Sequence, residues 1–155
     1  MREEAPSRIP WPPILLVAAP IAGWATERLA PVDWPILQSA AARGVGIILA
    51  ILALATIGWA ALELRRARTT IRPDAGATTL VTSGPFRFSR NPIYLADCLG
   101  LLGLGLILHV PWIALMVPVF AGLVTWLAIK PEEQHLEINF GQAYRDYKHS
   151  TRRWL

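Results

Sequence analysis

The stretch from residue 98 to residue 129 reads CLGLLGLGLILHVPWIALMVPVFAGLVTWLAI and contains no Asp, Glu, Lys or Arg. As a single helix it would be about 48 Å long, whereas the hydrocarbon core of a bilayer is about 30 Å thick. The segment His109-Val110-Pro111-Trp112 lies in its middle and combines a polar residue, a helix breaker and an interfacial aromatic residue. The stretch therefore predicts two membrane spans, at about residues 92–108 and 112–129, joined by a tight turn.

Two further uncharged segments upstream are long enough to cross a bilayer as helices. Residues 9–26 carry tryptophans near both ends, where tryptophan suits the membrane–water boundary, and residues 44–62 are rich in Ile, Leu and Ala. Hydrophobic residues make up 54% of the chain and charged residues only 17%, which is below the share of about 25% in soluble domains. A soluble globular domain is therefore disfavoured. The sequence predicts an all-α integral membrane protein with about four transmembrane helices.

The basic residues indicate which helix ends face the cytoplasm, since Lys and Arg collect on that side of a membrane. Only Arg28 and Arg43 lie between the first two predicted spans, and none lies in the turn at His109. All other Lys and Arg residues precede the first span, lie between the second and third, or follow the fourth. This asymmetry predicts a protein of the cell inner membrane with both termini in the cytoplasm. It also accounts for the net charge of +4 without a nucleic-acid partner.

The whole chain, residues 1–155, is interpreted as one membrane domain. Residues 69–89 are rich in Thr, Gly and Pro, which predicts an ordered cytoplasmic loop. The tail, residues 130–155, mixes charged and aromatic residues, as is typical of an amphipathic segment at the membrane surface, and Gly141 is expected to divide it into two short helices. The single cysteine, Cys98, cannot form an internal disulfide, and no Cys/His cluster predicts a metal site.

Polar residues gather at the cytoplasmic ends of the third and fourth predicted spans. They are Arg87, Arg90, Asn91, Tyr94 and Asp97 around the third span, and Glu132 and Glu133 just beyond the fourth. Because these spans form a hairpin, the two groups meet on one side of the membrane. If helical spacing extends back to Arg90, this residue shares one helix face with Tyr94 and Asp97.

Each of these residues also has a purely structural interpretation. The arginines suit membrane anchors, and the glutamates suit a first helical turn, where the helix dipole favours acidic residues. Together, however, an arginine, an Asn-Pro-x-Tyr element and a pair of carboxylates at one membrane face favour a functional site.

The same residues resemble a family signature. Residues 80–94 read LVTSGPFRFSRNPIY, which resembles the signature of the isoprenylcysteine carboxyl methyltransferase family, shared by the related phospholipid N-methyltransferases. The second block of that family is also present, as Glu132-Glu133, Phe140-Gly141, Tyr144, Tyr147 and a closing Arg152-Arg153-Trp154-Leu155. The resemblance covers about residues 69–155, with the two blocks in the family's order and a hairpin of the right length between them.

The resemblance implies an integral membrane methyltransferase that uses S-adenosylmethionine and methylates a lipophilic acceptor, isoprenoid-like or lipid-like, at the cytoplasmic face. Its implied partners are that acceptor and the membrane lipids, with no metal. The positions that match the family's cofactor-binding residues are Leu80, Val81, Phe86, Asn91, Pro92, Ile93 and Tyr94. The positions implied to have catalytic roles are Arg90, Glu132 and Glu133, with Glu132 facing the acceptor.

Two positions depart from the family pattern. Asn91 replaces the histidine of the family's Arg-His-Pro element, and an amide cannot titrate. Prenylcysteine enzymes carry an arginine one turn before the glutamate, suited to a substrate carboxylate, whereas this position is about Ala128 here and Lys130 is the nearest cation. A prenylcysteine acceptor is therefore disfavoured.

Two other functions remain open. The C-terminal region is also comparable in layout to sterol-type membrane reductases, which bind a nicotinamide cofactor, although no dinucleotide-binding glycine fingerprint is present. A non-catalytic membrane scaffold is the second alternative, in which Arg90 and Glu132 pair only to lock the hairpin.

Overall fold

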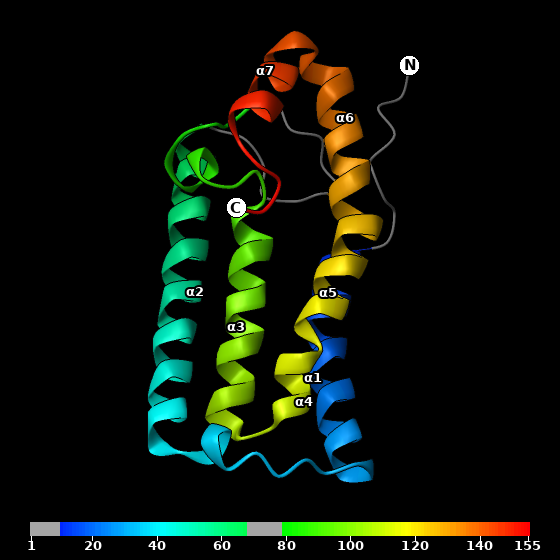
Figure 1. Ribbon diagram of the computed structural model, residues 1–155. Coiled ribbons are helices and arrows are strands. Elements are labelled where there is room, and N and C mark those ends of the chain that lie inside the picture. Colours follow the sequence, from blue (N-terminus) through cyan, green and yellow to red (C-terminus); the bar gives the residue numbers. More distant parts are fainter. Residues whose placement is uncertain (1–9, 68–78) are drawn as a thin grey trace.

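The computed structural model describes residues 10–67 and 79–155. The regular secondary structure in these ranges is entirely helical. Three helices, α1 (Trp11–Leu29), α2 (Ala40–Arg66) and α3 (Pro92–Leu108), stand side by side with a longer composite rod (Figure 1). The rod consists of α4 (Pro111–Leu115), α5 (Val117–Val124), the π-helical turn η3 (Thr125–Ile129) and α6 (Lys130–Phe140). The short helices η1 (Pro35–Gln38), η2 (Gly84–Arg87) and α7 (Gln142–Ser150) lie at the ends of these rods.

Some residues used in the sequence predictions lie outside the described ranges. They are Ile9, at the start of the first predicted span, residues 69–78 of the predicted loop, and the basic residues Arg2, Arg8, Arg68 and Arg72.

The helix boundaries follow from local sequence signals. Ser39 precedes α2, and its hydroxyl accepts a hydrogen bond from the Ala42 N–H at 3.1 Å, which satisfies one of the unpaired donors of the first turn. α3 and α4 both begin at a proline, which needs no hydrogen-bond partner there. α3 ends at His109, whose φ of 56° is left-handed, and the chain then turns directly into α4. The break predicted at this histidine is therefore where the helix ends.

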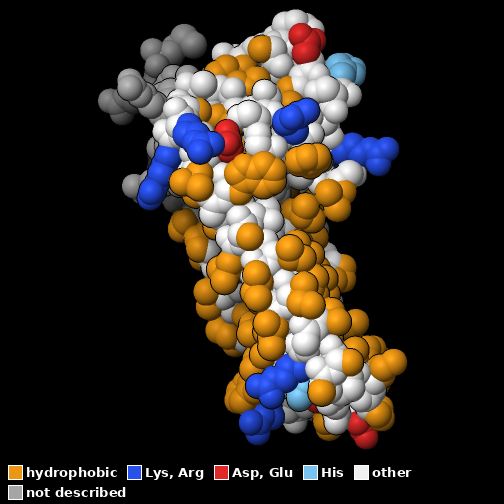
Figure 2. All heavy atoms as spheres, turned by 90° about the vertical axis from the view of Figure 1, so that its left-hand side faces the viewer, with side chains coloured by type: hydrophobic (Ala, Val, Ile, Leu, Met, Phe, Trp, Pro, Cys, Tyr) orange, Lys and Arg blue, Asp and Glu red, His pale blue; other side chains and the backbone are white. Residues whose placement is uncertain are grey.

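Within the described residues, two helices are long and apolar enough to cross a membrane: α2 and the composite rod Pro111–Phe140. α3 is equally apolar in sequence but has 17 residues. Large hydrophobic side chains are exposed along α2, among them Ile51 (60%) and Leu54 (70%). Figure 2 shows this face as a belt of hydrophobic side chains between charged groups at both ends. Exposed apolar surface of this extent marks a contact with lipid, so the protein is associated with a membrane.

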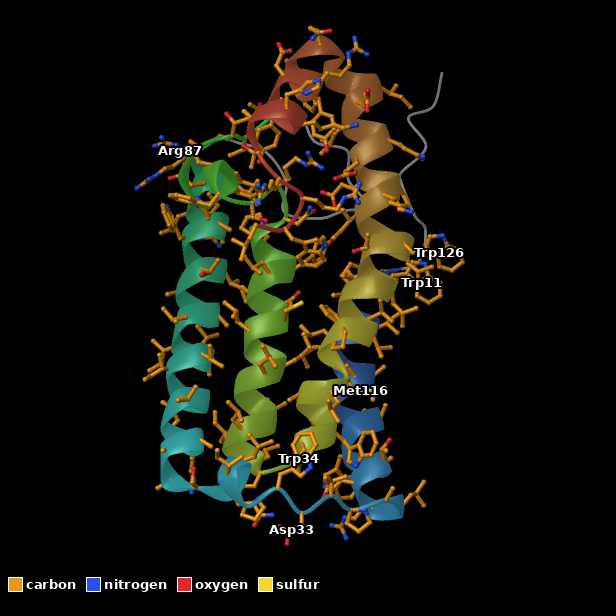
Figure 3. The ribbon with its side chains drawn as sticks, in the orientation of Figure 1. Trp11, Asp33, Trp34, Arg87, Met116 and Trp126 are labelled. Atoms are coloured by element: carbon orange, nitrogen blue, oxygen red, sulfur yellow. The ribbon has the colours of Figure 1, made fainter. Side chains whose placement is uncertain are left out.

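Tryptophans mark the two boundaries of the apolar belt. Trp11 and Trp126 both lie towards the end at which α3 begins, whereas Trp34 lies towards the opposite end (Figure 3). Trp126 is 67% exposed and Trp34 is 43% exposed. Tryptophan is enriched at membrane–water interfaces, so these positions agree with the boundaries of a bilayer.

The rod does not end where the sequence predicted the fourth span to end. It continues from α5 through η3 into α6 and stops at Phe140, where Gly141 takes a φ of 53° and separates α6 from α7. The first part of the predicted tail, residues 130–140, therefore extends the rod. This extension carries the two glutamates past the apolar part of the helix and towards the segment that precedes α3.

α2 and α3 pack closely along a line of small residues. Gly46 of α2 and Gly103 of α3 face one another: a Cβ atom added to Gly46 would lie 2.8 Å from the Gly103 carbonyl oxygen, and one on Gly103 would lie 2.7 Å from the Gly46 carbonyl oxygen. Ala53 and Gly100 continue this contact. Small residues of this kind allow helix backbones to approach each other in membrane proteins.

Replacing Gly103 by alanine is expected to destabilise the protein by about 1–3 kcal/mol, the usual cost of forcing extra atoms into a tight contact. The new methyl group would meet backbone atoms of α2, so α2 and α3 would have to separate. Gly58→Ala is the matched control, because a Cβ there meets no atom within 4 Å and alanine favours a helix. Thermal unfolding in detergent measures the difference, and equal midpoints for the two variants would contradict this packing.

The buried apolar core lies between α3 and the rod, where Cys98 and Leu101 meet Phe120, Val124 and Ala128. Tyr94 of α3 and Trp154, near the C-terminus, pack against this cluster. The core therefore leads directly to the polar residues at the start of α3.

Candidate functional site

The segment before α3 is held by the C-terminal segment of the chain. The Arg90 backbone N–H donates to the Arg152 carbonyl oxygen at 3.0 Å. The Asn91 side-chain amide and the Ser89 hydroxyl both donate to the Arg153 carbonyl oxygen, at 2.9 Å and 3.2 Å. Residues 62 to 64 positions apart in the sequence are thereby fixed beside each other, with Ser89 and Asn91 buried.

Arg90 does not lie on α3. The helix begins at Pro92, and Asn91 has φ −131°, which is not helical, so the predicted face shared by Arg90, Tyr94 and Asp97 is not formed. The guanidinium group instead points towards the C-terminal segment, where its Nη1 atom donates to the carbonyl oxygens of Lys148 (3.1 Å) and Thr151 (3.0 Å).

Glu133 is the centre of an ion-pair cluster with two arginines. Its Oε1 atom accepts from Arg90 Nη2 at 2.9 Å and from Arg153 Nε at 3.0 Å, and its Oε2 atom accepts from Arg153 Nη2 at 2.7 Å. The side chains of Arg90 and Glu133 are only 10% and 11% exposed. The cluster joins the segment before α3, α6 and the C-terminal segment. If the protein were a non-catalytic scaffold, Arg90 was expected to pair with Glu132. In the structure, Arg90 pairs with Glu133 instead.

The electrostatics of Glu133 follow from these contacts. Burial on its own raises the pKa of the carboxyl group. The hydrogen bonds from Arg153 and Arg90, together with the charges of these arginines, lower the pKa by more than burial raises it, so the pKa lies below its ordinary value. Glu133 is therefore a carboxylate at neutral pH, with both oxygens already bound.

Glu132 points to a different neighbour, because adjacent residues of a helix face directions about 100° apart. Its carboxyl group lies near the Tyr94 side chain. Glu132 lies beyond the apolar part of the rod, which ends at Ile129. Burial raises its pKa to about 7; the contact with Tyr94 opposes this rise and the charge of Glu133 adds to it. A carboxyl group of this kind exchanges a proton near neutral pH.

The other predicted cofactor residues lie at the same end of the molecule. Leu80 and Val81 are half-buried in the segment that leads into η2, and Phe86 lies within η2. The Phe86 carbonyl oxygen accepts a hydrogen bond from the Tyr147 hydroxyl at 2.6 Å, which ties η2 to α7. Pro92 is buried and Ile93 is half-buried in the first turn of α3.

η2 is also fixed to α2 on its other side. The Ser83 hydroxyl donates to Glu63 Oε2 at 2.8 Å, and Gly84, with φ 59°, fits against the side chains of Glu63 and Trp59 where a Cβ atom would not. Arg87, at the end of η2, points outward from the molecule (Figure 3). Of the arginines that the sequence singled out, Arg90 enters the site and Arg87 does not.

Several residues of the site were not assigned a role from the sequence. Arg153 is the main one, because it completes the ion-pair cluster; Tyr144 (1% exposed) and Tyr147 (7%) support the cluster from α7. A signal was available in the closing Arg152-Arg153-Trp154-Leu155, since a buried carboxylate needs counter-charges. Within the described residues, no group of three or more His, Cys, Asp or Glu side chains could hold a metal ion.

Comparison with known proteins adds an independent line of evidence. The model of the family described as "Phospholipid methyltransferase" matches residues 41–143, which include nearly all of α2, all of α3 and the rod, and the site residues up to Glu133 but not Arg153. A curated relative, the nickel-cobalt-cadmium resistance protein NccN of Alcaligenes xylosoxydans xylosoxydans, is 30% identical over 100 residues. That match covers 63% of this chain but only 43% of the relative, so the chain spans less than half of that protein. No solved structure matches.

Proposed function

The chain belongs to the phospholipid methyltransferase family, and on that premise we propose that it transfers the methyl group of S-adenosylmethionine to a lipophilic acceptor at a membrane face. The observation that carries this proposal is the separation of the two glutamates. Glu133 holds Arg90 and Arg153, whereas Glu132 stays beside Tyr94 with a pKa near neutrality.

The residues present fit a sulfonium donor. A sulfonium is a cation, and a half-buried carboxylate together with the face of an aromatic ring can hold a cation; Glu132 and Tyr94 provide both. Among the described residues, the buried Arg90 Nε atom has no hydrogen-bond partner, and it suits the carboxylate of the donor. The remaining proposed contacts are those named by the resemblance: Leu80, Val81, Phe86, Asn91, Pro92 and Ile93. When bound, S-adenosylmethionine supplies an electrophilic methyl group on a cationic sulfur.

The acceptor is proposed to be an amine. The position one turn before Glu132 is Ala128, which is buried in the apolar core, and the nearest cation on the rod is the exposed Lys130. Among the residues that the structure describes, this side of the site therefore offers no positive charge to a carboxylate acceptor. An ammonium group must lose a proton before its nitrogen can attack, and Glu132 is placed to accept that proton. Glu133 is not suited to this role, because both of its oxygens are bound by arginines.

The proposed topology has four spans, α1, α2, α3 and the rod up to Ile129, with both termini in the cytoplasm. Its support is the arrangement of these helices side by side, with the site, the start of α1 and the C-terminus at one end (Figure 1). In this topology Glu132 and Tyr94 lie at the cytoplasmic boundary, where a lipid-like acceptor reaches them from the bilayer. Held in place there, donor and acceptor gain much of their reactivity from alignment alone.

Transfer of label from methyl-labelled S-adenosylmethionine into lipid is the test of this function. The purified protein in nanodiscs made from bacterial lipid extract is expected to move label into the organic phase. Tyr94→Ala is expected to lower the rate at least tenfold, because a cation–π contact away from water contributes about 2 kcal/mol. Arg87→Ala is the matched control, since this side chain points away from the site. No transfer by the wild type, or equal transfer by both variants, would contradict the proposal.

A further inference from the structure

Asp97 is a charged residue that the proposed reaction does not yet use. It is the only charged residue of α3, whose sequence is PIYLADCLGLLGLGLIL, and it is half-buried. It lies five positions into the helix, roughly 7.5 Å along the axis from Pro92. An ionisable residue within an apolar membrane helix is costly and faces protein, water or a ligand.

The described part of the chain supplies no counter-charge to this carboxylate. The ion pairs there involve Glu63, Glu133 and Glu137, and none involves Asp97. The two arginines of the site, Arg90 and Arg153, are bound to Glu133. Among the described residues this carboxylate therefore has no ion-pair partner, and an ammonium group would supply the opposite charge.

Asp97 lies on the same face of α3 as the site. It lies three positions after Tyr94, so the two side chains are neighbours on the helix surface. Both carboxylates, Glu132 and Asp97, are close enough to Tyr94 to interact with it electrostatically. Asp97 follows Tyr94 along α3, so it continues the line of polar groups from the start of the helix towards its apolar part.

This line matches an ammonium headgroup on an apolar chain. An ammonium group has three N–H donors, so it can bond to Asp97 and still present one N–H to Glu132. The apolar chain of such a molecule would extend into the bilayer, from which the acceptor arrives. The donor has a charged end as well, but it enters from the polar side, where Arg90 and Glu132 lie.

We propose that Asp97 binds the cationic amine of the methyl acceptor and thereby selects amines over carboxylic acids and alcohols. This inference rests on the proposed methyl transfer. In the balanced step, the ammonium gives one proton to Glu132, and the nitrogen lone pair forms the bond to the methyl carbon. The carbon–sulfur bond breaks, its electron pair stays on sulfur, and S-adenosylhomocysteine leaves. The product is again an ammonium ion, so Asp97 keeps its partner.

The test uses single-chain probes of equal length in nanodiscs. Dodecylamine serves as acceptor, dodecyltrimethylammonium as a cation that cannot accept a methyl group, and dodecanol as the neutral match. Asp97→Asn is expected to raise the KM for dodecylamine about tenfold or more, the usual effect of losing a hydrogen bond to a charged group, with kcat within about twofold. Dodecyltrimethylammonium has no N–H donor and is expected to inhibit the wild type through its charge alone, and to inhibit Asp97→Asn more weakly than the wild type. Dodecanol is expected to inhibit neither.

The controls separate this inference from the proposed function. Asp33→Asn changes an exposed aspartate at the opposite end of the molecule and is expected to behave as the wild type (Figure 3). Asp97→Glu keeps the charge and is expected to restore most of the inhibition, which separates loss of charge from loss of folding. Unchanged KM and inhibition in Asp97→Asn would overturn the inference, and so would a parallel loss of affinity for S-adenosylhomocysteine. If the wild type transferred no methyl group to any acceptor, the proposed function itself would fail.

Discussion

Glu132→Gln is expected to lower the rate of methyl transfer to an amine by about 10²- to 10⁴-fold, the usual contribution of a positioned general base. Glutamine keeps the size of the side chain and its contact with Tyr94 but cannot accept the proton. The loss is expected in the chemical step, so single-turnover experiments with saturating S-adenosylmethionine are the right measurement.

The pH dependence gives a second readout of the same group. Burial raises the pKa of Glu132 to about 7. A base works in its deprotonated form, so the wild-type rate is expected to rise with pH, about tenfold per pH unit well below 7, and to level off above it. In Glu132→Gln this rise should disappear.

Glu137→Gln is the matched control for both measurements. Glu137 lies on the same helix but pairs with Lys148 at 2.9 Å, on the exposed side of α6 and α7. Its removal is expected to leave the rate and the pH profile unchanged. A Glu132→Gln variant that kept the wild-type rate, or a wild-type profile without an inflection between about pH 6 and 8, would rule out the proposed base.

Glu133→Gln is expected to have its largest effect on stability. Removing one partner of a buried ion pair leaves the other charges without compensation and typically costs about 3–5 kcal/mol. Here two guanidinium groups, Arg90 and Arg153, would lose their carboxylate at once. The thermal unfolding midpoint in detergent is expected to fall accordingly, whereas Glu137→Gln should change it little, because the Glu137 side chain is 34% exposed to solvent.

The lowered pKa of Glu133 also determines how the stability of the fold changes with pH. Because its pKa is lower in the folded protein than in the unfolded chain, the ion-pair cluster stabilises the fold at every pH above the ordinary value of a glutamate. That contribution is lost as the pH falls through the folded-state pKa. The difference in unfolding midpoint between wild type and Glu133→Gln should therefore shrink in acid. A constant difference down to about pH 3 would contradict the ion-pair account.

The sequence predicted the arrangement of the site well where local rules decide it. Charge-free stretches and the proline after His109 predicted the hairpin of α3 and the rod, and the hairpin places Tyr94 and Glu132 together. The condition for Arg90 to share a face with Tyr94, that helical spacing extends back to Arg90, is not met, and for a local reason. A residue before proline avoids the helical region, so Asn91 could not continue α3 backwards.

Other features depend on contacts that a sequence does not contain. Glu132 and Glu133 are chemically identical neighbours, and only the orientation of α6 decides which of them meets Tyr94 and which meets the arginines. The orientation of α6 depends on the π-helical turn η3 that precedes it. A π-helical turn contains an extra residue, so it rotates the side chains of α6 about the helix axis. Arg153 reaches Glu133 only because the C-terminal segment folds back and its backbone binds Ser89 and Asn91. These contacts join residues more than 60 positions apart, so local sequence signals do not indicate them.

Calorimetric titration of the purified protein with S-adenosylhomocysteine tests the central claim most directly, because it measures donor binding without any assumption about the acceptor. Methyl transfer at the Tyr94–Glu132 site predicts saturable binding to one site per chain, weakened in Tyr94→Ala and undisturbed by NADPH. No saturable heat, or displacement by NADPH as a nicotinamide-dependent reductase would show, would contradict the account.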